Sequence, residues 1–199
     1  LFLERQISTV SVSAATSTYT NPISAVDFFK KTGVDCLAIS YGTKHGASKG
    51  KDTVIRKEIA IAIKECLRHE GIFGVLVSHG SSTVPGYIVD EINALGGNVQ
   101  NAYGIKIEQL QEVAKCGIGK INVDTDIRLA VTRNLREMFR DRPELRQSAS
   151  IGGVWDLLVK HPEAFDPRAF LPPIMDTVMF GNVPDSDVAA VVECVEKGV

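Results

Sequence analysis

Short apolar runs alternate with amphipathic stretches along most of the chain. Three largely apolar runs, at residues 36–39, 72–77 and 118–123, lack the regular polar alternation of a half-exposed strand and are typical of strands buried on both faces. Helical spacing predicts helices over about residues 21–33, 53–70, 87–95, 108–115 and 126–139. Strands separated by helices predict an α/β fold with a parallel sheet and helices outside it.

The first predicted helix carries clear signals at both of its ends. Asn21 is a good N-cap, and Pro22 suits the first helical position because an N–H there would have no partner within the helix. Gly33 is typical of a left-handed terminator. The first helix is therefore expected to begin after Asn21 and to end at Gly33.

The helical pattern weakens after Asp141. Residues 142–155 mix loop positions with a short helical start, and residues 161–173 hold four prolines, which predicts an extended segment on the surface. Helical spacing resumes over residues 185–199. We expect residues 1–199 to form one domain, with 142–199 as a C-terminal arm and helices.

The number of strands limits the possible architectures. Only three strands are convincing, or four if residues 7–12 form another, whereas a closed (β/α)8 barrel needs eight strands and about 250 residues. Half a barrel would leave two open strand edges. Three explanations remain open: the chain is incomplete, it pairs with something that completes it, or it forms an open doubly wound sheet.

Composition excludes several classes of protein. The net charge is -2 and the 23% of charged residues are interspersed, so neither a nucleic acid nor a membrane surface is an expected partner. No apolar run reaches the ~18 residues of a membrane span, and the first residues do not resemble a secretory signal. The four cysteines are widely spaced and are expected to be reduced, which favours a cytoplasmic location.

Each predicted strand runs into a polar cluster. The first is followed by residues 41–49 (YGTKHGASK), the second by 78–82 (SHGSS) and the third by 122–126 (NVDTD). Ligands of parallel α/β proteins bind at the carboxyl ends of the strands. The three clusters are therefore expected to meet at one site.

His45 and His79 are the candidate metal ligands. Each lies just after a strand and is followed by glycine, and neutral imidazoles from neighbouring strand ends can bind one zinc ion. The alternative is two hydrogen-bonded loop histidines. His69, near a helix C-terminus, and His161, beside a proline, are interpreted as ordinary surface residues.

Several residues of the same clusters suit an anion. Gly46 and Gly80 would let backbone N–H groups approach a phosphate, Ser82 would add a donor, and Lys49 would supply charge. Tight turns with a solvated lysine are the alternative. Asn122 and Asp124 are two apart and share one face, while Thr125 or Asp126 is a candidate N-cap. Simple capping of that helix is the alternative to phosphate binding there.

Taken in order, these clusters resemble those of class II fructose-bisphosphate aldolases. Residues 41–49 resemble the family's GTxHGxxK segment, 78–82 its HGxS segment and 120–126 its KxNxDTD segment. Residues 19–22 (YTNP) and 165–168 (FDPR) are similar to further landmarks of the family, in the same order. The resemblance covers nearly all of the chain from Tyr19 onward.

The resemblance implies a TIM barrel, of which this chain supplies roughly the second half. It also implies reversible cleavage of fructose 1,6-bisphosphate to dihydroxyacetone phosphate and glyceraldehyde 3-phosphate. His45 and His79 match zinc ligands, and zinc or another divalent ion would polarise the ketone. A monovalent cation (Na⁺ or K⁺) near the phosphate loops and a homodimer or homotetramer are further family features.

The resemblance also implies roles for individual residues around the substrate. Asn122 matches a residue that contacts the substrate near the reacting carbons, and Arg168 matches an arginine that reaches the other phosphate, in some members from a neighbouring subunit. The positions around the dihydroxyacetone phosphate group are matched by Gly46, Lys49, Gly80, Ser82, Asp124 and Thr125.

Parts of the family pattern are not found in this sequence. The family's catalytic aspartate and a further zinc histidine belong to its amino-terminal half, and the zinc-associated glutamate has no match among residues 1–17, so Glu4 receives no role. Thr83 stands where the family often has glycine. The abrupt start favours a fragment of a longer aldolase. The alternatives are an aldolase for tagatose or sedoheptulose bisphosphate, and an inactive half barrel that binds phosphosugars.

Overall fold

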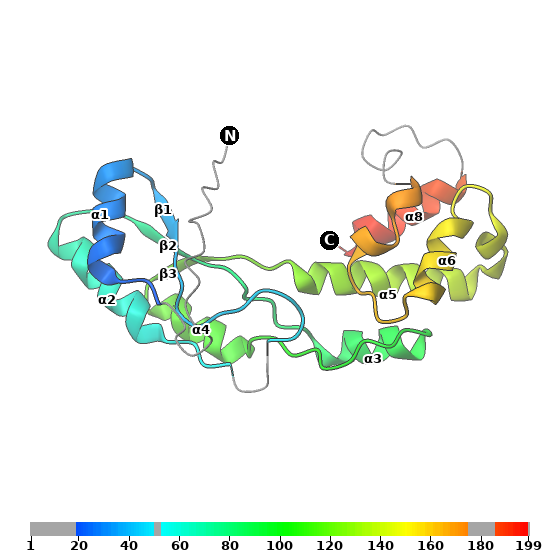
Figure 1. Cartoon of the computed structure of the whole chain (residues 1–199), viewed down its shortest axis with the longest axis horizontal. Coiled ribbons are helices and arrows are strands. Elements are labelled where there is room, and N and C mark those ends of the chain that lie inside the picture. The colour runs from blue at the N-terminus through cyan, green and yellow to red at the C-terminus, as the bar shows by residue number, and fades with distance from the viewer. Residues whose placement is uncertain (1–18, 50–52, 175–185, 199) are drawn as a thin grey trace.

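Three short parallel strands form the only sheet within the part of the chain that the structure describes. The computed structural model describes residues 19–49, 53–174 and 186–198. The strands are β1 (Cys36–Ala38), β2 (Val75–Ser78) and β3 (Ile118–Ile121), in the order β1-β2-β3 (Figure 1). Leu37 pairs with Leu76, which in turn pairs with Ile118. The predicted α/β fold with a parallel sheet is confirmed, whereas the possible strand at residues 7–12 lies outside the described residues.

Three helices lie around the sheet: α1 (Pro22–Thr32), α2 (Lys57–His69) and α4 (Ile107–Lys115). Asn21 caps α1 as predicted, because its Oδ1 accepts hydrogen bonds from the N–H groups of Ile23 (2.9 Å) and Ser24 (3.2 Å). Gly33 ends the helix with φ +65°. The apolar faces of α1, α2 and α4 pack with the strands into one core, which includes Phe29, Ile63, Leu67, Leu76, Val113 and Ile118.

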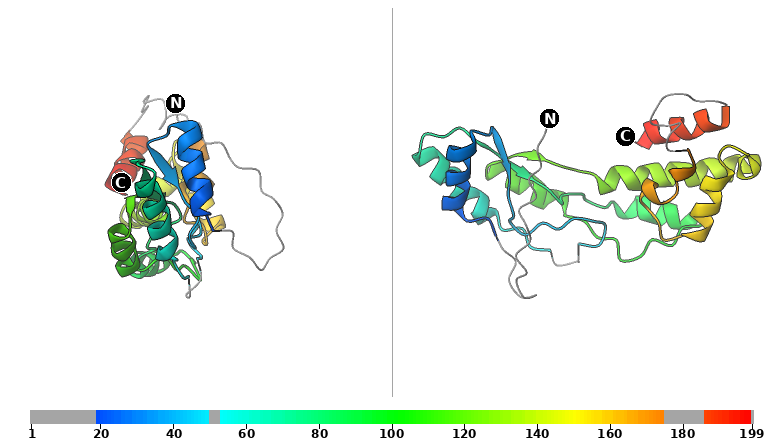
Figure 2. Two further views of the ribbon diagram at one scale, coloured as in Figure 1. Left: turned by 90° about the vertical axis from the view of Figure 1, so that its left-hand side faces the viewer. Right: turned by 45° about the horizontal axis from the view of Figure 1, so that its top comes forward.

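A second group of helices gathers at the far end of the long helix α5 (Thr125–Asp141), which runs away from the sheet (Figures 1 and 2). This group contains α6 (Gly152–Lys160), α8 (Ser186–Gly198) and a short 3₁₀ helix, η1 (Pro143–Gln147). Their core with α5 includes Leu135, Phe139, Leu158 and Val191, all fully buried. Helix α3 (Gly86–Ala94) packs near the start of α5, where Val89 and Ile92 lie in a separate core with Leu129. The helical spacing predicted after residue 185 is confirmed by α8.

The proline-rich segment differs from its prediction. Residues 161–173 were expected to run extended over the surface, but the segment contains the 3₁₀ helix η2 (Pro167–Ala169), and a further one, η3 (Pro172–Ile174), closes it. Phe170 and Leu171 are buried in the core beside α5 and α6. The apolar side chains between the prolines therefore draw the segment into the second core.

All four cysteines are free, as predicted. Cys194 is buried among apolar side chains, and that burial raises the pKa of its thiol. Cys36 and Ala38 are both exposed on β1. None of the helices in the described ranges has the length and apolar character needed to cross a membrane.

Candidate active site

The two candidate metal histidines lie side by side at neighbouring strand ends. His45 follows β1 in an exposed loop, and the half-buried His79 follows β2 directly. Their ring centroids are 5.8 Å apart, with an angle of 44° between the ring planes. Two imidazoles bound to one tetrahedral zinc at about 2.0–2.1 Å would have centroids roughly 5–6 Å apart. The pair therefore fits two ligands of one zinc ion.

Asn122 brings the end of the third strand to the same place. Its backbone N–H donates to the carbonyl of Ser78 (2.9 Å), which extends the pairing of β3 with β2. Its Nδ2 lies 3.0 Å from Nε2 of His79 and 3.4 Å from Nδ1. The amide therefore lies beside the imidazole instead of in line with one ring nitrogen. The three strand ends converge as the sequence predicted.

The described residues place no third candidate metal ligand beside His45 and His79. Among the described residues, no group of three or more histidine, cysteine, aspartate or glutamate side chains lies close enough to hold a metal ion. His69 is the last residue of α2, and His161 is the C-cap of α6. The candidate metal ligands within this part of the chain are therefore His45 and His79 alone.

Lys49 occupies an unexpected position between the two histidine loops. The residue is only 3% exposed. Its ammonium donates to the carbonyls of Lys44 and Gly80, both at 2.7 Å. Burial lowers the pKa of Lys49, and the charge of Asp126 opposes that shift. The solvated lysine that the sequence left open as an alternative is not found.

A buried network of hydroxyl groups lies at the ends of β1 and β2. The Tyr41 hydroxyl is hydrogen-bonded to Ser78 Oγ, which lies 2.6 Å from Ser81 Oγ. All three residues are fully buried. Burial raises the pKa of Tyr41, although the bonds to the two serines act in the opposite direction. Sequence reasoning missed this network; the signal available was a run of small polar residues directly after an apolar strand.

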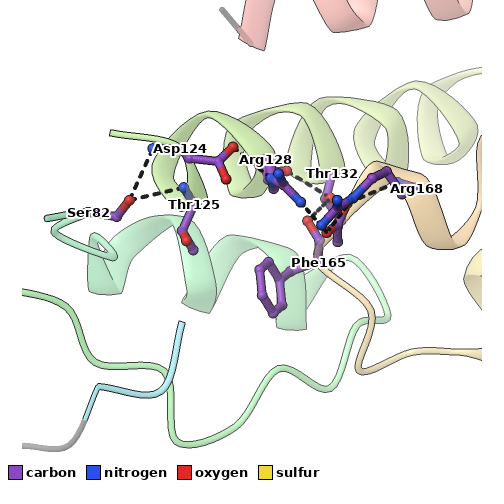
Figure 3. Close-up of polar contacts among 8 residues, drawn as sticks. Ser82, Asp124, Thr125, Arg128, Thr132, Phe165 and Arg168 are labelled. Carbon is purple, nitrogen blue, oxygen red and sulfur yellow. Dashed lines mark hydrogen bonds and ion pairs between the residues drawn. The ribbon is translucent and has the colours of Figure 1, made fainter. Parts of the chain in front are cut away.

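Ser82 connects the second strand end to the start of α5. Its Oγ accepts hydrogen bonds from the backbone N–H groups of Asp124 (3.1 Å) and Thr125 (3.0 Å) (Figure 3). The predicted caps, Thr125 and Asp126, are therefore wrong in detail: the N-cap residue is Asp124, and the capping oxygen comes from Ser82 in another loop. Both bonds use lone pairs of Ser82 Oγ, and its hydroxyl proton has no acceptor among the described residues.

Asp126 holds the loop that follows Ser82. Its carboxylate accepts from the N–H (2.8 Å) and hydroxyl (2.9 Å) of Thr83 and from the N–H of Val84 (2.7 Å). Val84 has φ +50°, which is unusual for a β-branched residue. These bonds keep the Ser82 loop against the start of α5.

Arg168 belongs to a chain of ion pairs. Its guanidinium donates to Asp166, with the shortest contact at 2.6 Å, and is 72% exposed. Asp166 is also bonded to Arg128, whose Nε donates to Asp124 (2.7 Å) (Figure 3). Partial burial would raise the pKa of Asp166, but the hydrogen bonds from Arg168 and the charge of Arg128 hold it below its usual value. Arg168 and Asp166 therefore form an ion pair at the surface.

A hollow of about 560 Å³ lies beside His45. The loop after β1 forms one side through residues 45–48, and residues 98–100, Glu163 and Phe165 form the other. A ligand at His45 would therefore have open space next to it.

The fold and this geometry define an α/β protein whose candidate ligand site lies at the carboxyl edge of a parallel sheet. Comparison with known proteins narrows the class. The sequence profile of the family described as "Fructose-bisphosphate aldolase class-II" matches residues 4–180. The chain belongs to this family.

Curated relatives of this chain are named as fructose-bisphosphate aldolases. "Fructose-bisphosphate aldolase 2" of Cereibacter sphaeroides is 37% identical over 159 residues, covering 80% of this chain and 40% of that protein. "Fructose-bisphosphate aldolase" of Giardia intestinalis is 38% identical, covering 80% of this chain and 43% of its own length. The chain thus spans less than half the length of these curated relatives. A crystal structure of fructose-bisphosphate aldolase from Campylobacter jejuni aligns over 89% of this chain and 42% of its own, with 18% identity and a TM-score of 0.47, too weak a likeness to define the fold.

Proposed function

We propose that the complete protein containing this chain is a metal-dependent aldolase. It would reversibly cleave fructose 1,6-bisphosphate to dihydroxyacetone phosphate and glyceraldehyde 3-phosphate. The observation that carries the proposal is the pair His45 and His79, 5.8 Å apart at neighbouring strand ends of a chain of the aldolase family. The names of its relatives do not favour an inactive sugar-binding module.

His45 and His79 would hold zinc or another divalent ion together with ligands from the rest of the protein. The bound ion supplies Lewis-acid chemistry, polarising the substrate ketone and stabilising the enediolate. Asn122, beside His79, would contact the substrate near the reacting carbons. A monovalent cation (Na⁺ or K⁺) beside these loops is part of the same proposal.

The phosphate of dihydroxyacetone phosphate would bind between the second and third strand ends. Ser82 supports this, because its hydroxyl accepts two backbone N–H groups and has its proton left for an anion. Thr125 begins α5, where the helix dipole favours negative charge. Gly46, Gly80 and Asp124 belong to the same proposed site. Phosphate binding by Lys49 stays a prediction, because two of its three N–H donors are directed at carbonyls.

The rest of the proposal concerns the complete protein. The three-stranded sheet would be part of a TIM barrel that is completed by further strands. Arg168 would bind the second phosphate of the substrate, because a guanidinium can donate two parallel hydrogen bonds. The complete protein would be a cytoplasmic homodimer or homotetramer that acts on a small sugar bisphosphate.

Replacing His79 tests the metal site. In the complete protein, His79→Ala is expected to lose bound zinc and aldol cleavage together, because an ion with too few ligands is poorly retained. His69→Ala is the matched control, since His69 is 88% exposed at the end of α2. Zinc content after gel filtration and turnover of fructose 1,6-bisphosphate are the measurements. Normal zinc content and turnover in His79→Ala would show that the metal assignment is wrong.

A further inference from the structure

The Lys49 ammonium joins the peptide groups that flank the two histidines. One of its acceptors is the carbonyl of Lys44, the residue directly before His45, and the other is the carbonyl of Gly80, the residue directly after His79. Both distances are 2.7 Å. The same cation therefore holds both histidine loops, at points one residue away from each imidazole.

The two loops also touch at their backbones. Gly80 has φ +64°, and a Cβ placed there would lie 2.6 Å from the carbonyl oxygen of Lys44. Only glycine permits this approach, which brings the two carbonyls within reach of one ammonium. The backbone contact and the lysine thus act at the same point between the loops.

The main chain around Lys49 is itself fixed. The Lys49 N–H donates to the carbonyl of Tyr103 (3.1 Å), and the Tyr103 N–H donates to the carbonyl of Ala47 (2.7 Å). The side chain therefore extends from an anchored backbone into a site where it is 3% exposed. Little freedom remains for the ammonium to move toward a substrate.

We propose that Lys49 is a positioning residue that sets the spacing of His45 and His79 for the metal. The inference rests on the proposed metal site and adds a role that differs from phosphate binding. Charge-assisted hydrogen bonds in a buried site are stronger than neutral ones, so the ammonium resists separation of the two loops. Side chains that orient metal ligands indirectly typically change metal affinity by about 10- to 100-fold.

The affinity of the complete protein for Co²⁺ tests this role. Co²⁺ reports its coordination through visible absorption, and its affinity follows from competition with a chelator. Lys49→Met keeps the length of the side chain and removes the donors, so Co²⁺ should bind about 10- to 100-fold more weakly. Lys44→Met is the matched control, because it removes one positive charge from an exposed side chain next to His45. It leaves the hydrogen bonds of the Lys49 ammonium to the carbonyls of residue 44 and Gly80 in place.

The outcomes separate the competing explanations. An unchanged Co²⁺ affinity in folded Lys49→Met, with only KM for the bisphosphate raised, would make Lys49 a phosphate ligand and overturn the inference. An equal loss in Lys44→Met would assign the effect to charge alone and overturn it as well. Absence of Co²⁺ binding by the wild type would overturn the proposed function, and the inference with it. If Lys49→Met does not fold, Lys49→Gln is measured in its place. Its amide keeps a donor for one carbonyl, so its affinity for Co²⁺ should lie between those of the wild type and a variant without the donors.

Discussion

Single side chains bind the three strand-end loops to one another. Asn122 lies against His79, Ser82 caps α5, and Lys49 joins the loops that carry His45 and His79. Each of these bonds crosses from one strand end to another, so the loops behave as one unit. A substitution at one of them is expected to disturb its neighbours as well as its own contact.

Arg168 is expected to act on substrate affinity without affecting the metal. Arg168→Ala should raise KM for fructose 1,6-bisphosphate by about 10- to 100-fold, since a hydrogen bond to a charged group contributes about 1.5–3 kcal/mol. Zinc content should stay unchanged, because the guanidinium contacts Asp166 and neither histidine. Steady-state kinetics and metal analysis are the measurements. Arg68→Ala is the control, as Arg68 is 78% exposed on α2.

Subunit exchange shows whether Arg168 contributes to the site of its own subunit or to that of a neighbouring subunit. Mixing Arg168→Ala with His79→Ala under exchange conditions creates dimers in which one site has an intact His79 and an Arg168 from the partner. Partial recovery of cleavage is expected if the residue acts across an interface. No recovery despite demonstrated exchange would place Arg168 in its own subunit's site or outside any site.

At the scale of elements, α5 connects the proposed phosphate site with the Arg168 segment. Its first turn meets Ser82, and three residues four apart along one face bind the segment at residues 158–166. Arg128 bonds Asp166, and Thr132 Oγ1 donates to the carbonyl of Phe165 (2.7 Å) (Figure 3). Arg136 donates to the carbonyl of Leu158 (3.1 Å). The helix therefore fixes the distance between the two regions.

Asp126, on the first turn of α5, is expected to stabilise the Ser82 loop. Asp126→Ala would leave the N–H groups of the half-buried Thr83 and the buried Val84 without their acceptor, at about 1–3 kcal/mol for each unsatisfied group. The free energy of unfolding should fall by about 2–4 kcal/mol, and KM should rise as the loop loosens. Urea denaturation and kinetics check this. Asp90→Ala, at an exposed site on α3, should change neither quantity; equal stability of the two variants would contradict the account.

Local signals in the sequence predicted the ends of helices well, but they did not predict the contacts between elements. Asn21 and Gly33 marked the ends of α1 because capping depends on the residues themselves. The helix predicted from residue 53 starts at Lys57 instead, since the N–H of Arg56 is bonded to the carbonyl of Tyr41. Such tertiary bonds override helical spacing and leave no periodic trace in the sequence.

The same limit applies to the candidate site. The convergence of His45, His79 and Asn122 was predictable, because parallel strands end at one edge of a sheet. The burial of Lys49 and the cap from Ser82 were not, because each depends on how two loops meet. Residue type identified the chemistry there, while the partners required the fold.

At the scale of the whole molecule, the sheet is incompletely covered within the described residues. Cys36 and Ala38 on β1 and Gly119 and Lys120 on β3 are exposed. The chain spans less than half the length of the relatives it matches. These observations support the proposal that further strands complete the barrel around the site.

The 199 residues alone are expected not to cleave fructose 1,6-bisphosphate at a useful rate. The described residues offer no third metal ligand, and the aspartate that would move protons is expected from elsewhere in the protein; general acid–base catalysis contributes roughly 10²–10⁴-fold. Turnover by residues 1–199 compared with the complete protein is the measurement. Normal turnover by the shorter chain would require a substitute acid within it.

Metal dependence of the complete protein tests the central claim most directly. Cleavage of fructose 1,6-bisphosphate is measured before treatment with EDTA, after the chelator and its metal are removed, and after zinc is added back. The proposed role of His45 and His79 predicts that cleavage is lost with the metal and returns with zinc. Undiminished cleavage by metal-free protein would contradict it.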